Sequence, residues 1–239
     1  MRLPKTNVQI FSDGADKESM LRLAQCPEVK GITTNPSLMK KAGISDYKGF
    51  ALDVLKDIKN LPISFEVFSD EFSEMHRQAL EIKSWADNVY VKIPVTNSKG
   101  EWSIDLIREL SQAGVKLNVT AVFNIEQVTK VCEALKGGAP SYVSIFAGRI
   151  ADTGVDPVPL MKESLEICRN HGEQIELLWA STREVYNIIQ ADEAGCDIIT
   201  VPPSILDKFS SMHHRSPKQL SLETVQAFKK DSEIAGFEL

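Results

Sequence analysis

One lysine stands inside an apolar run that has the composition of a β-strand. Lys92 lies in residues 89–94 (VYVKIP), where apolar neighbours on both faces indicate a buried strand. Lysine is rarely buried without a reason, and burial disfavours the ammonium, which leaves a neutral amine able to form a Schiff base with a carbonyl substrate. A purely structural ion pair to Glu66 or Asp13 explains the same pattern, so the residue types alone leave both roles open.

Two carboxylates accompany this lysine in similar positions. Glu66 lies in the apolar run of residues 62–67, and Asp13 follows the run of residues 8–12. Two carboxylates near a buried amine would provide the proton donors and acceptors that carbon–carbon bond chemistry requires. The alternative roles are an ion-pair partner of Lys92 for Glu66 and a helix N-cap for Asp13, although Asp16 suits the cap better.

A hydroxyl and two guanidinium groups follow later apolar runs. Arg149 comes after residues 142–147, and Ser181 and Arg183 come after residues 174–180. Arginine offers a planar fork to phosphoryl oxygens, so this trio predicts a phosphate site. The alternative is a pair of surface arginines that balance the acidic excess of the chain.

The elements that must position these residues alternate along the whole chain. We expect strands at residues 8–12, 30–34, 62–67, 89–94, 116–122, 142–147, 174–180 and 197–201. We expect helices at residues 15–25, 45–58, 70–84, 103–113, 125–136, 157–170, 183–194, 204–210 and 218–231. Eight such repeats in 239 residues predict an α/β fold, one (β/α)₈ TIM barrel with an additional C-terminal helix, in a single domain spanning residues 1–239. An open, doubly wound sheet that binds a dinucleotide would need a G-x-G-x-x-G turn, which the sequence lacks.

Composition excludes several classes of function. With 27 Lys and Arg against 33 Asp and Glu, the net charge is −6, and no basic block is present to bind nucleic acid. No apolar run reaches the roughly 18 residues of a membrane-spanning helix, and the first residues do not resemble a signal peptide, so we expect a cytoplasmic protein. The four cysteines and four histidines are scattered without the spacing of a metal site.

Two motifs carry a resemblance to a known family. Residues 31–37 (GITTNPS) and 91–96 (VKIPVT) resemble those of the transaldolase family, which includes the small fructose 6-phosphate aldolase-like branch, and the match spans nearly the whole chain. The resemblance implies a barrel with a Schiff-base lysine, Lys92, on its fourth strand. It also implies that neither a metal nor an organic cofactor is needed.

The resemblance assigns further roles position by position. Asp13 corresponds to the aspartate that takes the proton of the substrate C4 hydroxyl, and Glu66 to the glutamate that serves proton transfer through a water held with Thr120. The remaining residues implied to bind substrate are Thr33, Asn35, Asn118, Ser144 and Phe146 at the sugar, and Arg149, Ser181 and Arg183 at its phosphate.

Two positions favour one branch of the family over the other. The aldolase branch has glutamine at the position of Glu66 and tyrosine at that of Phe146, so this chain follows the transaldolase pattern. The implied activity is transfer of a dihydroxyacetone unit from sedoheptulose 7-phosphate or fructose 6-phosphate to glyceraldehyde 3-phosphate or erythrose 4-phosphate, in the pentose phosphate pathway. The alternatives are an aldolase that releases dihydroxyacetone and a non-catalytic barrel that binds sugar phosphates. We also expect a homo-oligomer, in which the final helix packs on its own barrel or on a neighbour's.

Overall fold

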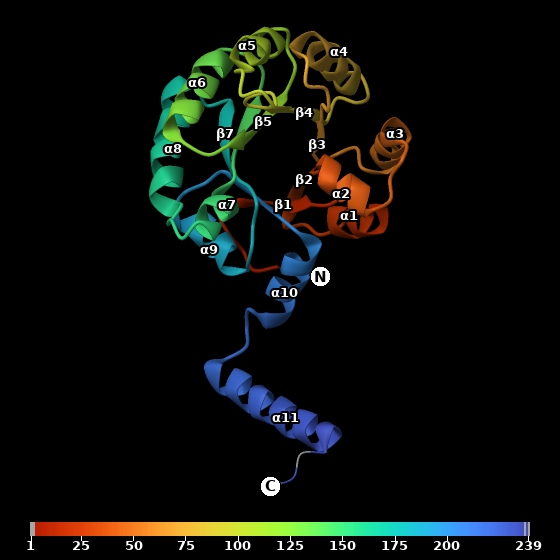
Figure 1. Ribbon diagram of the computed structural model, residues 1–239, viewed down its shortest axis with the longest axis vertical. Coiled ribbons are helices and arrows are strands. Elements are labelled where there is room, and N and C mark those ends of the chain that lie inside the picture. Colours follow the sequence, from red (N-terminus) through yellow and green to blue (C-terminus); the bar gives the residue numbers. More distant parts are fainter. Residues whose placement is uncertain (1–2, 237, 239) are drawn as a thin grey trace.

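Eight parallel strands close into a barrel in the order in which they occur along the chain (Figure 1). The computed structural model describes residues 3–236 and 238. The strands are β1 (Gln9–Asp13), β2 (Val29–Thr33), β3 (Ile63–Glu66), β4 (Val89–Pro94), β5 (Leu117–Val122), β6 (Ser141–Ile145), β7 (Ile175–Trp179) and β8 (Ile198–Val201). Each lies within two residues of its predicted position, and the closed barrel rules out the open sheet.

Helices surround the barrel and follow its strands. They are α1 (Lys17–Ala24), α2 (Pro36–Lys41), α3 (Tyr47–Asp57), α4 (Phe72–Lys83), α5 (Ile104–Gln112), α6 (Ile125–Leu135), α7 (Ala147–Asp152), α8 (Val158–His171), α9 (Tyr186–Glu193), α10 (Pro203–Met212) and α11 (Pro217–Ala235). The predicted set lacked α2 and α7, which are six residues each and too short to show a helical repeat. Two boundary differences concern residues at the carboxyl ends of strands: Ala147 begins α7 instead of ending a strand, and Arg183 lies in the loop before α9.

Alternation along each strand separates the structural core from the barrel interior. On β4, Val91 and Ile93 are fully buried in the main core, which the outward faces of the strands share with the helices. Lys92 points the other way because successive side chains of a strand lie on opposite faces. Tyr90 and Tyr142 stack inside the barrel with ring centroids 4.1 Å apart, and Phe11 packs edge-on against Tyr142. These rings fill the interior, so the polar residues gather where the strands end.

Local capping leaves Asp13 free for another role. The side chain of Asp16 accepts a hydrogen bond from the backbone N–H of Ser19 and caps α1. The structure thereby confirms Asp16 as the N-cap. Asp13, the last residue of β1, instead borders the pocket at the carboxyl ends of the strands.

The final helix stands away from the barrel (Figure 1). None of the residues of α11 is buried, and Leu222, Val225 and Phe228 are each more than half exposed. The predicted C-terminal helix is therefore present, and it begins one residue earlier and ends four residues later than expected. Among residues 3–236 and 238, no helix combines the length and apolarity needed to span a membrane.

Candidate active site

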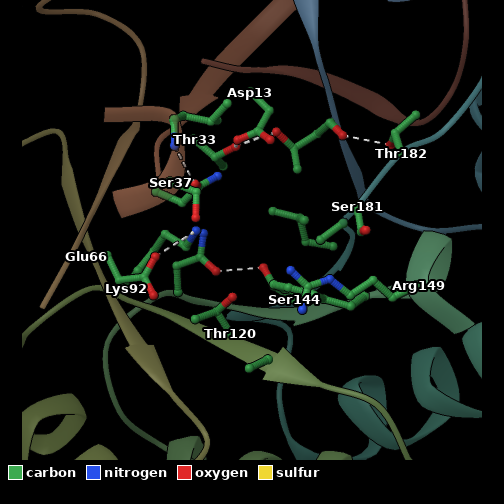
Figure 2. Close-up of a pocket in the computed structure, with 18 of the residues that line it drawn as sticks. Asp13, Thr33, Ser37, Glu66, Lys92, Thr120, Ser144, Arg149, Ser181 and Thr182 are labelled. Atoms are coloured by element: carbon green, nitrogen blue, oxygen red, sulfur yellow. Dashed lines mark hydrogen bonds and ion pairs between the residues drawn. The ribbon is translucent and has the colours of Figure 1, made fainter. Parts of the chain in front are cut away.

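The carboxyl ends of the strands surround a pocket of about 550 Å³ (Figure 2). All twelve residues predicted for the site line this pocket: Asp13, Thr33, Asn35, Glu66, Lys92, Asn118, Thr120, Ser144, Phe146, Arg149, Ser181 and Arg183. They come from strands, loops and the short helix α7, spread over most of the chain. Closure of the barrel brings them together, as this architecture does in barrel enzymes generally.

Lys92 is buried at the floor of the pocket and has two polar partners. Its Nζ lies 3.3 Å from Oε2 of Glu66 and donates a 2.9 Å hydrogen bond to the carbonyl oxygen of Thr34. Lys92 and Glu66 occupy paired positions on β4 and β3, so strand register sets their contact. The ion pair considered from the sequence is therefore present. It does not exclude a covalent role, because the carboxylate is placed to accept the proton that the amine must lose before it can attack a carbonyl.

Asp13 lies at the end of β1 with a threonine hydroxyl directed at it. Thr33 Oγ1 donates to Asp13 Oδ1 over 2.8 Å and is also hydrogen-bonded to Thr200 Oγ1. Because the single hydroxyl proton of Thr33 goes to Asp13, Thr200 must donate to Thr33. Burial raises the pKa of Asp13 above its ordinary value, while Lys92 and the Thr33 hydrogen bond oppose this rise. Asp13 is thus a stronger base than an exposed aspartate.

Asn118 is held at both ends of its amide. Its Nδ2 donates to Ser64 Oγ over 3.0 Å, and its Oδ1 accepts from Ser144 Oγ over 2.6 Å. This leaves one amide N–H free to meet a substrate hydroxyl in the pocket. Thr120, two residues further along β5, has a buried hydroxyl with no hydrogen-bond partner among the described residues. A buried polar atom without a partner beside a pocket is suited to hold water or substrate.

Arg149 and Ser181 lie across the pocket from Lys92 and Glu66 (Figure 2), and Arg183, two residues after Ser181, also lines the pocket. Arg149 stacks over the ring of Phe146 at 5.1 Å, and no carboxylate pairs with it in the part of the chain that the structure describes. Arg183 instead directs Nε and Nη2 at Asp152, with the shortest contact 2.6 Å. One guanidinium edge of Arg183 is therefore occupied and the other remains for an anion.

Ser181 owes its position to an unusual backbone and to a glycine beside it. Its φ of +67° lies in the left-handed region, which non-glycine residues seldom occupy. A Cβ on Gly148 would lie 1.6 Å from the carbonyl oxygen of Ser181, so only glycine permits this approach. Ala121 is the other non-glycine residue with positive φ among those described, and it also lines the pocket. Backbone strain of this kind gathers at functional sites.

Asn35 and Phe146 line the rim. Asn35 caps α2, because its Oδ1 accepts from the backbone N–H of Leu38, so only its amide nitrogen is left for a substrate. Its role at a substrate hydroxyl stays a prediction. Phe146 precedes α7 and packs against Phe123 with ring centroids 5.4 Å apart.

Comparison with known proteins agrees with this arrangement. The family model described as Transaldolase/Fructose-6-phosphate aldolase matches residues 10–239. The chain belongs to this family. A probable transaldolase of Dehalococcoides mccartyi is 36% identical over 199 residues, which cover 83% of this chain and 88% of that protein. A probable transaldolase 2 of Listeria monocytogenes is 33% identical over 229 residues, which cover 95% and 96%.

A solved structure shares the fold of this family member. The protein titled "QR15, an Aldolase" has a TM-score of 0.55 with 14% sequence identity, covering 87% of this chain and 97% of that one. At this identity the match concerns the barrel alone. Together, the family and the names of the relatives show a transaldolase- or aldolase-type enzyme.

The sequence patterns did not identify several polar residues that contact the predicted residues of the pocket. Thr200 stands in the otherwise apolar run of β8, which is the same signal that singled out Lys92. Ser64 on β3 precedes Glu66 by two residues and therefore faces the same side of its strand. Trp179, the last residue of β7, is fully buried in the main core and does not line the pocket. In the described ranges, no three His, Cys, Asp or Glu side chains are placed to hold a metal ion.

Proposed function

We propose that this protein is a transaldolase that moves a dihydroxyacetone unit between sugar phosphates through a Schiff base on Lys92. The observation that carries the proposal is the position of Lys92, a buried amine 3.3 Å from a carboxylate at the floor of a pocket whose opposite side carries arginines. This arrangement suits a ketose whose carbonyl lies at one end and whose phosphate lies at the other. By family resemblance, the reaction belongs to the pentose phosphate pathway in the cytoplasm.

The first step forms the covalent link to the substrate. Glu66 accepts a proton from the Lys92 ammonium, and the neutral amine adds to the C2 carbonyl of the ketose phosphate. Loss of the carbinolamine hydroxyl as water then gives an iminium ion. Proton transfer to that leaving hydroxyl falls to Glu66, through a water molecule that the hydroxyl of Thr120 would help to hold.

The second step breaks the C3–C4 bond. Asp13 accepts the proton of the C4 hydroxyl, C4 becomes the aldehyde of the departing aldose phosphate, and the bonding electrons pass into the iminium to give an enamine on Lys92. The raised pKa of Asp13 favours its acceptance of this proton. Asn118 and Ser144 are placed to hold the hydroxyls of the fragment that remains.

The third step transfers this fragment to an acceptor. The enamine carbon attacks the aldehyde of a second aldose phosphate, Asp13 returns its proton to the new hydroxyl, and water then hydrolyses the iminium to free Lys92. Protonation of the enamine carbon, followed by hydrolysis of the resulting iminium, would instead release dihydroxyacetone. Phe146 disfavours this outcome because its ring carries no group that can donate or accept a proton.

An acceptor-dependence assay tests the proposed activity. The purified protein is given fructose 6-phosphate with and without erythrose 4-phosphate, and sedoheptulose 7-phosphate and free dihydroxyacetone are both measured. We expect sedoheptulose 7-phosphate to form rapidly and dihydroxyacetone to be released slowly whether or not an acceptor is present. Rapid dihydroxyacetone release without acceptor would assign the chain to the aldolase branch.

A further inference from the structure

The backbone of Glu66 lacks a neighbouring strand on one edge. The β2–β3 ladder reaches the hydrogen bond from Thr34 N–H to Ser64 C=O, at 3.2 Å. Two residues further, a regular parallel ladder would join Glu66 N–H to Thr34 C=O and Glu66 C=O to the N–H of residue 36. Residue 36 is proline, which has no N–H, so Glu66 C=O has no regular partner there. Glu66 N–H bonds to another group as well, and Thr34 C=O accepts from Lys92 Nζ at 2.9 Å.

The hydroxyl of Tyr47 provides both missing partners. It accepts from Glu66 N–H over 2.8 Å and donates to Glu66 C=O over 2.9 Å. Tyr47 is the first residue of α3, and its ring makes edge-on contacts with Phe65 and Phe68 at centroid distances of 6.3 and 5.6 Å. Burial raises the pKa of Tyr47 well above its ordinary value, so the hydroxyl keeps the proton that it donates.

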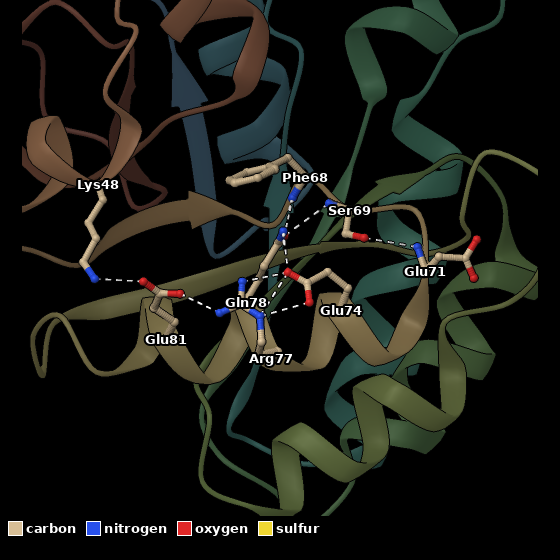
Figure 3. A network of polar contacts seen from close by, with 8 residues as sticks. All are labelled: Lys48, Phe68, Ser69, Glu71, Glu74, Arg77, Gln78 and Glu81. Carbon is tan, nitrogen blue, oxygen red and sulfur yellow. Dashed lines mark hydrogen bonds and ion pairs between the residues drawn. The ribbon is translucent and has the colours of Figure 1, made fainter.

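A second contact fixes the chain immediately beyond Glu66. The buried side chain of Gln78 accepts through Oε1 from the backbone N–H groups of Phe68 and Ser69, at 3.0 and 3.2 Å (Figure 3). In the same network Glu81 pairs with Lys48 of α3 and with Arg77 of α4. The segment that carries Glu66 is thus held from α3 on one side and from α4 on the other.

We propose that Tyr47 is a positioning residue for Glu66. By taking the place of the absent strand, its hydroxyl fixes the backbone of Glu66, while Thr34 C=O holds the amine of Lys92. The hydroxyl therefore positions the carboxylate of the ion pair through the backbone, without touching the carboxylate. This inference rests on the proposed function, because it assigns Tyr47 an effect on turnover through the proton transfers of Glu66.

A double-mutant cycle tests this role. Tyr47→Phe keeps the ring in its aromatic contacts and removes only the hydroxyl. We expect kcat with fructose 6-phosphate and erythrose 4-phosphate to fall by roughly 10-fold while KM changes little, because a small misplacement of a reacting group slows chemistry more than binding. Glu66→Gln should slow kcat by about 10² to 10⁴-fold. In that background the further effect of Tyr47→Phe should vanish, since the group it positions is no longer an acid or base.

Controls show whether the change in kcat is specific to the hydroxyl of Tyr47. Tyr186→Phe removes the hydroxyl of an exposed tyrosine on α9 and should leave kcat unchanged. Thermal unfolding and borohydride trapping of substrate on Lys92 establish that Tyr47→Phe retains its fold and its amine. An unchanged kcat in Tyr47→Phe, or an equal further loss in the Glu66→Gln background, would overturn the positioning role. Absence of trapping in the unmodified protein would instead reject the proposed function, so the two failures are distinguishable.

Discussion

The hydroxyl of Thr33 donates a 2.8 Å hydrogen bond to the carboxylate of Asp13, across paired positions of β1 and β2. This bond stabilises the charged form of a carboxyl group whose burial favours the neutral form. The two effects act in opposite directions on one pKa, and burial is the larger. Asp13 can accept a proton only when ionised, so the pH dependence of the reaction should reveal this balance.

We predict that activity falls on the acid side at a pH above the ordinary pKa of an aspartate, because the pKa of Asp13 is raised. Thr33→Val removes the hydrogen bond that lowers this pKa. The acid limb of the pH–rate profile of this variant, where activity falls with decreasing pH, should therefore move to still higher pH. Thr33→Ser keeps a hydroxyl and is the matched control. The measurement is kcat across the acidic range for all three proteins. Identical limbs for wild type and Thr33→Val would show that Asp13 is not the group that titrates.

The barrel and most of its site were predictable because both follow from the period-two pattern of strands. Lys92 and Glu66 were identified because each is a charged residue in an otherwise apolar strand. The strand order of a closed barrel brings such positions together. The short helices α2 and α7 were missed because six residues hold too few apolar positions to establish a repeat. Asn35 and Phe146, which line the pocket, directly precede these two helices.

Some contacts between side chains of distant elements could not be predicted from the sequence. Tyr47 lies on α3, 19 residues from Glu66, and no local pattern indicates that its hydroxyl replaces a strand. The pairing of Arg183 with Asp152 likewise depends on how the loop before α9 meets the end of α7. Periodicity predicts which face a residue takes, whereas these contacts depend on the tertiary path of loops.

Substitution of the arginines should separate phosphate binding from chemistry. Arg149→Ala or Arg183→Ala should lower kcat/KM for fructose 6-phosphate by about 10- to 100-fold, the range for a lost hydrogen bond to a charged group. Unphosphorylated fructose should be affected far less. Arg108→Ala, which removes an exposed arginine that pairs with Asp105 on α5, is the control. Equal losses for both sugars would show that these arginines do not bind the phosphate.

Phe146→Tyr should convert part of the transfer into aldol cleavage. The new hydroxyl would be able to assist a water molecule that hydrolyses the iminium, so dihydroxyacetone release without acceptor should rise by about 10-fold or more. Phe123→Tyr adds the same group to the neighbouring ring, which does not line the pocket, and should have little effect. Similar rates of dihydroxyacetone release in both variants and the wild type would show that position 146 does not determine the branch.

The exposed apolar face of α11 supports our proposal that the protein is a homo-oligomer. Leu222, Val225 and Phe228 recur every three residues on this helix and are 58%, 61% and 69% exposed. Burying Phe228 against a neighbouring copy would contribute about 1.5–3 kcal/mol. Phe228→Glu should therefore reduce the mass measured by sedimentation, whereas Gln226→Glu on the same helix should not. A wild-type protein that sediments as a monomer would contradict this proposal.

Trapping of the covalent intermediate tests the central claim most directly. The protein is incubated with saturating fructose 6-phosphate and sodium borohydride, and the modified lysine is located by mass spectrometry of its peptides. Lys92→Arg, which keeps a positive charge beside Glu66, is the matched control. We predict one reduced sugar adduct, on Lys92, that is absent from the variant. An adduct on another lysine, or none at saturating substrate, would contradict the Schiff-base mechanism, and the second result would favour a barrel that only binds sugar phosphates.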